Sequence, residues 1–230
     1  MSRTCLPPST FEFLRELREH NNREWFNAHK PRYQAELAQV AELAEQLLAR
    51  MSLHDELEPM TAKQSLFRIY RDVRFSKDKS PYKTHFSGQM KRATKWRRGG
   101  YYFHFEPGGS FAGGGFWAPN AADLKRIREE LAADARPLRE LIAAPEFRET
   151  FGQLEGEQLK TAPQGYSADH PDIDLLRYKQ FLLTRAFTDQ EVTAPGFLDQ
   201  LVESFRRMIP FFDYMSEVLT TDANGVPLEE

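Results

Sequence analysis

The chain has little cysteine: its 230 residues include one, Cys5. A single cysteine excludes an intramolecular disulfide framework and a zinc centre made of cysteine ligands. No stretch approaches the roughly 20 consecutive apolar residues that a membrane span requires. Residues 1–10 are mostly polar and contain two prolines, so we expect no secretory leader, no membrane contact and a cytoplasmic location.

Several catalytic signatures are also missing. The glycines at 113–115 lack the Lys-Ser/Thr ending of a phosphate-binding P-loop, and no G-x-S-x-G nucleophile motif occurs. His85 and His104 are predicted on neighbouring strands, with Glu106 and Asp72 near them in sequence. No H-x-H or H-x-x-x-H spacing fixes two ligands on one face. We therefore predict no metal ion and no cofactor.

Composition favours a packed globular protein. Hydrophobic residues make up 40% of the chain and aromatic residues 13%, including 18 phenylalanines, while 28% of the residues are charged. Apolar residues recur every three to four positions after Pro31 and again after Pro195, which predicts amphipathic helices near both ends. The chain is long enough for a substantial core.

Short segments between these helices have the pattern of antiparallel strands. Residues 83–92, 100–106, 110–118 and 181–187 are rich in aromatic or alternating residues and are bounded by turn residues. In the second of them, Tyr102, His104 and Glu106 share one face. The run of glycines at 113–115 implies close approach of a ligand or of a packed helix.

These patterns predict one α+β domain over residues 1–221. We expect a mostly antiparallel sheet of about 4–6 strands, with N-terminal, central and C-terminal helices packed on it. Residues 222–230 are predicted to be a frayed tail.

Charge is distributed unevenly along the chain. The net charge is −3, yet the segment from Lys63 to Arg98 holds 12 lysines and arginines and 2 acidic residues, or +10. The remainder of the chain is therefore at −13. A concentrated group of cations attracts phosphates, carboxylates or nucleic acid, although many charge runs are simply solvated surfaces.

The core of this basic segment predicts a strand, a loop and a second strand. Residues 66–75 are predicted as a strand with one apolar face interrupted by Arg71, and 76–81 as a turn-rich loop. Arg185 likewise falls on the apolar face of the strand predicted over 181–187. Each of these two arginines either serves a ligand or forms a structural ion pair whose acidic partner the sequence does not identify.

Residues 68–83 read R-I-Y-R-D-V-R-F-S-K-D-K-S-P-Y-K. This motif resembles the signature of an uncharacterised family of bacterial and fungal proteins, the domain of unknown function 2461. Further segments also resemble that family, at 99–106 (G-G-Y-Y-F-H-F-E), 113–119 (G-G-G-F-W-A-P) and 159–179. The resemblance covers nearly the whole chain and implies a single-domain unit, without an activity, a ligand or a catalytic residue.

The first functional hypothesis is a site for an anionic small molecule bearing phosphate or carboxylate, in a binding protein or an enzyme. Arginine can bind such groups through two hydrogen bonds. The candidate ligand-binding residues are Arg68, Arg71, Arg74, Lys77, Lys79, Lys83 and Arg185. Asp72, His85 or His104 could transfer protons as a general acid or base.

Two other functions remain open at the level of sequence. Aromatic residues are interleaved with the cations, as in proteins that bind single-stranded nucleic acid, although the isoelectric point is about 6.1. Alternatively, the basic segment docks on the acidic surface of a partner without catalysis. The sequence leaves the oligomeric state open.

Overall fold

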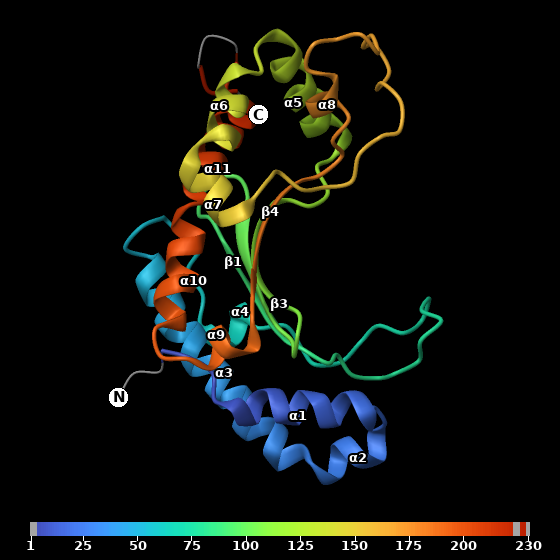
Figure 1. The fold of residues 1–230 in the computed structure, drawn as a ribbon, viewed down its shortest axis with the longest axis vertical. Helices are drawn as coiled ribbons and strands as arrows, with labels where there is room; N and C mark the ends of the chain where they lie inside the picture. Colours follow the sequence, from blue (N-terminus) through green and yellow to red (C-terminus); the bar gives the residue numbers. More distant parts are fainter. Residues whose placement is uncertain (1–3, 223–225, 229–230) are drawn as a thin grey trace. The chain divides into compact units, whose positions relative to one another are not determined.

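The computed structural model describes residues 4–222 and 226–228. It is a single α+β domain with one antiparallel sheet of four strands in the order β1-β2-β3-β4. Figure 1 shows the course of the chain from the N-terminal helices through the sheet to the C-terminal helices. The strands are β1 (Phe86–Lys91), β2 (Gly100–Phe105), β3 (Ser110–Phe116) and β4 (Phe181–Phe187). The predicted fold class and the four predicted central strands are confirmed, each strand ending within a few residues of its expected bounds.

Helices precede, separate and follow the strands. In the N-terminal part they are α1 (Pro8–Glu19), α2 (Arg23–Ala28), α3 (Lys30–Met51) and α4 (Ala62–Ser65). Between β3 and β4 lie α5 (Ala121–Ala133), α6 (Arg136–Ala143), α7 (Pro145–Phe151) and α8 (Ile173–Leu176). After β4 come α9 (Asp189–Thr193), α10 (Phe197–Arg206) and α11 (Ile209–Thr220).

Two compact units can be distinguished in the chain. Of the described residues, the first contains 4–90, 102–112 and 186–203, and the second contains 91–101, 113–185, 204–222 and 226–228. Among the described residues, no helix is both long and apolar enough to cross a bilayer.

The core of the first unit anchors the basic segment. The side chain of Asn22 caps α2 by accepting a hydrogen bond from Trp25 N at 2.9 Å. This positions Phe26, whose ring stacks on Tyr82 with centroids 3.9 Å apart. Asn21 adds a two-way link, since its amide donates to Tyr82 O at 2.9 Å and its oxygen accepts from Tyr82 N at 3.1 Å. Tyr82 therefore fixes the basic segment to the turn between α1 and α2.

In the second unit, the glycine run of β3 accommodates close packing of helices and strands. A Cβ atom on Gly114 would lie 2.7 Å from both Met208 Sδ and Phe212 Cζ. Gly115 has φ +133°, and a Cβ atom there would overlap Phe181 O of β4. Of the two explanations that the sequence allows, the packed protein itself therefore accounts for these two glycines.

The prediction of a strand over residues 66–75 is wrong. Its residues form two isolated antiparallel bridges, Leu66 with Gly88 and Tyr70 with Tyr82, and no continuous ladder. Figure 1 shows this segment in teal, as an extended path between α4 and β1. We call residues 66–85 the basic hairpin.

Burial in the basic hairpin alternates as expected from Ile69 to Arg74 but not at the two ends of the predicted strand. Ile69 is buried, but Phe67 is 40% exposed and Phe75 is 95% exposed. Alternation in a strand depends on regular pairing that keeps the pleat, and two isolated bridges do not impose it.

The C-terminal tail was predicted to fray after residue 221. Of this tail, residues 223–225 and 229–230 lie outside the described part of the chain. Its described residues show one bridge between Thr221 and Pro227, with a hydrogen bond from Leu228 N to Thr220 O at 2.9 Å.

Candidate functional site

Three of the seven candidate cations hold the basic hairpin together. Arg71 is ion-paired with Asp78, and its side chain is 28% exposed. Arg74 binds both carboxylate oxygens of Asp72, at 2.9 Å from Nε and 2.6 Å from an Nη atom. Lys79 donates to Val73 O at 2.9 Å. The acidic partner that the sequence could not identify for Arg71 is therefore a neighbour seven residues along the chain.

Arg185 is half-buried on β4 of the second unit, where it donates to Ser204 Oγ at 2.9 Å. Its face of the strand is otherwise apolar as predicted, because Phe181, Leu183 and Phe187 are buried. The sequence grouped Arg185 with the hairpin cations, but its hydrogen bond to Ser204 belongs to the second unit.

Arg68 and Lys83 differ from the other hairpin cations. Neither forms an ion pair with any residue in the described ranges 4–222 and 226–228. The ammonium group of Lys83 lies over the ring of Phe67, 5.4 Å from its centroid. Partial burial, with the positive charge of Arg68 nearby, lowers the pKa of Lys83. Lys77 is exposed on the same hairpin and likewise has no acidic partner within the described part of the chain.

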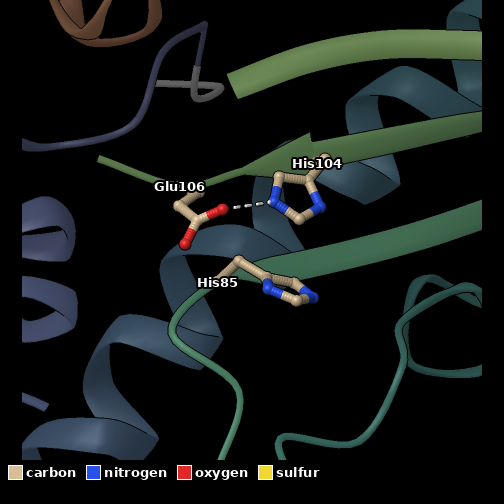
Figure 2. Close-up of side chains that lie close together, drawn as sticks. All are labelled: His85, His104 and Glu106. Carbon is tan, nitrogen blue, oxygen red and sulfur yellow. Dashed lines mark hydrogen bonds and ion pairs between the residues drawn. The ribbon is translucent and has the colours of Figure 1, made fainter. Parts of the chain in front are cut away.

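His85 and His104 meet beside the base of the hairpin, as Figure 2 shows, with ring centroids 4.0 Å apart. His85 directly precedes β1, His104 lies on the neighbouring strand β2, and Glu106 follows β2. One potential ligand atom from each of the three side chains, a ring nitrogen or a carboxylate oxygen, lies within 4.8 Å of the other two. The sequence predicted the two histidines on neighbouring strands; they do lie side by side, but His85 stands one residue before β1 and not within it.

A chain of hydrogen bonds holds His104 and Glu106 in place. His104 Nε2 donates to Glu106 Oε2 at 3.0 Å, and His104 Nδ1 lies 3.0 Å from the hydroxyl of Tyr102. The other carboxylate oxygen of Glu106 accepts from Thr84 and from Arg18, each at 3.0 Å. Both side chains are therefore oriented before any ligand arrives.

The environment also sets the charges of this cluster. Burial alone would raise the pKa of Glu106, but hydrogen bonds from His104 and Thr84 outweigh it, so the pKa lies below its usual value. Burial lowers the pKa of His85 to about 4, and His104 adds to the effect. At neutral pH, Glu106 is therefore ionised and His85 is uncharged.

His85 is the least constrained member of the cluster. Within the described residues its ring makes no hydrogen bond, and it lies against the ring of His104 at an interplanar angle of 33°. A neutral imidazole with an unoccupied nitrogen can accept a proton or bind a metal ion. Asp72, the third candidate for proton transfer, is instead exposed and paired with Arg74.

The sequence places Tyr102, His104 and Glu106 on one face, and there Glu106 was considered only as part of a metal site that was not predicted, while Tyr102 had no predicted role. Arg18, on α1, was not a candidate at all. The face of β2 is readable from alternation, whereas the contact of Arg18 with Glu106 spans 88 positions. No local pattern carries that information.

A family model described as a conserved hypothetical protein (DUF2461) matches residues 9–214. The chain belongs to the DUF2461 family. No curated protein and no solved structure matches the chain. The match contains every candidate site residue, so the basic hairpin and the histidine pair lie within the DUF2461 domain.

Proposed function

We propose that this DUF2461 protein binds a small anion bearing phosphate or carboxylate, held by Arg68 and Lys83 at the base of the basic hairpin. The observation that carries the proposal is that these two cations lie near one another without acidic partners among the described residues. Arg71, Arg74 and Lys79 have partners within the hairpin and contribute to its shape.

Electrostatics supports an anion at this position. Two like charges held together disfavour one another, and burial of Lys83 reduces the solvation that would compensate. An anion between Arg68 and Lys83 would relieve this repulsion and form charge-assisted hydrogen bonds to both. Arginine offers a planar fork to phosphate or carboxylate, and lysine adds a point charge.

The cations of the second basic stretch support the small-anion function over nucleic-acid binding. In residues 91–98, Arg92 is ion-paired with Asp213, and Arg98 is ion-paired with Asp123 at 2.5 Å. These pairs reduce the positive charge that a phosphate backbone would meet there.

The proposal is tested by thermal unfolding in phosphate, citrate, a nucleoside monophosphate and a short single-stranded oligonucleotide, at constant ionic strength. A ligand at about 100 times its Kd stabilises a protein by about 2.7 kcal/mol. For a chain of this size that raises Tm by roughly 5–10 °C. We expect at least one small anion to produce such a shift.

The shift should depend on Lys83. In Lys83→Met, which keeps an apolar side chain over Phe67, we expect the anion-induced shift to fall to a third or less. Lys63→Met is the matched control, because Lys63 is exposed on α4 and the charge change is identical. An unchanged shift in Lys83→Met would overturn this placement of the site.

Arg74→Ala separates the base of the hairpin from its tip. Since Arg74 is already bound to Asp72, its removal should leave the anion-induced shift intact. Loss of the shift in Arg74→Ala but not in Lys83→Met would move the ligand to the tip. A shift with the oligonucleotide alone would favour nucleic acid, and no shift with any anion would favour a protein partner.

A further inference from the structure

We propose that His85, His104 and Glu106 form a binding site for a divalent transition-metal ion, with Zn²⁺ as the probe. This proposal uses other side chains than the anion contacts proposed for Arg68 and Lys83, and it stands whether or not an anion binds there. No second cluster of three potential ligands of these types occurs within residues 4–222 and 226–228.

The separation of His104 and Glu106 already suits two ligands on one ion. Zinc binds nitrogen and carboxylate oxygen at about 2.0–2.2 Å, so two ligands at angles of 90–110° lie roughly 3.0–3.4 Å apart. His104 Nε2 and Glu106 Oε2 are 3.0 Å apart. A metal ion would take the place of the hydrogen that His104 Nε2 now donates to Glu106 Oε2, and the neutral imidazole would carry its proton on Nδ1 instead.

The hydrogen bonds around these ligands are those expected of a metal site. Binding through Nε2 of His104 requires the proton on Nδ1, where the hydroxyl of Tyr102 stands 3.0 Å away and can accept it. That hydroxyl is also hydrogen-bonded to Ser87. Thr84 and Arg18 hold the second oxygen of Glu106 and leave the first for the ion.

His85 would supply the third ligand. Its nearest ligand atom lies within 4.8 Å of those of His104 and Glu106, so a rotation of the ring must bring it closer. That rotation breaks no hydrogen bond within the described chain and alters only the tilted ring contact with His104. Figure 2 shows the His85 ring facing His104, with the Glu106 carboxylate beside them.

The donor set and the surrounding charge indicate which ion fits. Two imidazoles and one carboxylate suit Zn²⁺ and neighbouring first-row ions, whereas Ca²⁺ and Mg²⁺ prefer oxygen ligands. Glu106 supplies one negative charge, and positive charges of Lys83 and Arg71 act on His85. We therefore expect a Kd nearer to micromolar than to the nanomolar values of closed structural zinc sites.

The test uses tag-free full-length protein that has been treated with EDTA and exchanged into chelator-free buffer. Equilibrium dialysis against Zn²⁺, followed by elemental analysis, gives stoichiometry and Kd, and Co²⁺ absorption reports nitrogen and oxygen ligation. We expect about one ion per chain. His85→Ala, His104→Ala and Glu106→Gln should each raise the Kd at least about tenfold.

His54→Ala is the matched control, because His54 is exposed in the turn after α3 and stands outside the cluster. Glu106→Gln keeps an oxygen that can accept from Thr84 and Arg18, so it is the variant most expected to keep the fold. Thermal unfolding of each metal-free variant checks this. Stoichiometry below about 0.2, or equal Kd values in wild type and Glu106→Gln, would overturn the site.

Discussion

Replacing Gly115 with alanine should destabilise the protein by about 4 kcal/mol or more, which is roughly a 10 °C loss in Tm. Gly115 lies in β3 at φ +133°, a conformation that side-chain-bearing residues rarely adopt. Its Cβ would overlap Phe181 O and lie 3.0 Å from Leu182 Cα, both backbone atoms of β4. A backbone atom cannot move aside as a flexible side chain can, so strand pairing must give way. Chemical denaturation followed by circular dichroism measures the effect.

Gly152→Ala is the control for backbone conformation alone. Gly152 follows α7 with φ +71°, and a Cβ there meets nothing within 4 Å. We expect a loss of about 1 kcal/mol. Equal losses for Gly115→Ala and Gly152→Ala would show that close packing of β3 on β4 contributes nothing.

Phe212→Ala should be the second most damaging change, at about 3–5 kcal/mol. Phe212 is fully buried on α11, and its ring contacts those of Tyr101 and Phe116, with centroids 5.2 and 6.3 Å away. Removing the ring sacrifices its burial and leaves a cavity that the surrounding helix and strands can only partly fill. Urea unfolding gives the change in free energy directly.

The matched control is the same substitution in the basic hairpin. Phe75 is 95% exposed, so Phe75→Ala should change stability by no more than about 0.5 kcal/mol. A loss of 2 kcal/mol or more at Phe75 would mean that the hairpin tip is buried in solution.

A double-mutant cycle tests the contact between Phe212 and the glycine run. A Cβ on Gly114 would lie 2.7 Å from Phe212 Cζ, so Gly114→Ala should cost less once the ring is removed. We expect a coupling of about 1 kcal/mol or more between Gly114→Ala and Phe212→Ala. Strict additivity would contradict the assignment of this glycine to helix packing.

The cations of the basic hairpin fall into those bound within it and those without an acidic partner among the described residues. The basic hairpin carries six of the candidate cations, yet Arg71, Arg74 and Lys79 are bound within it. Arg68 and Lys83 remain at its base, near the histidine pair. A count of charges along the sequence treats all of these residues alike. The hydrogen bonds and ion pairs of the folded chain distinguish the cations that are already bound from those that are not.

Much of the fold follows from local patterns in the sequence. The α+β class, the amphipathic helices and the four strands were predicted because spacing of apolar residues reflects the period of each element. The strand predicted over residues 66–75 rested on the same kind of pattern, and there the prediction was wrong. Its apolar residues alternate, but isolated bridges at Leu66 and Tyr70 leave Phe67 and Phe75 exposed.

By itself, the sequence determined the fold class, the location of the basic segment and the shared face of Tyr102, His104 and Glu106. Each depends on residues close together in the chain, where composition and side-chain period suffice. The tertiary structure decided that His85 lies against His104, that Arg18 and Thr84 hold Glu106, and that Lys83 has Arg68 rather than a carboxylate beside it. These arrangements depend on strand register and on the path of loops between distant residues. The interaction of charged groups depends on their distance and burial. No local sequence pattern specifies any of these quantities.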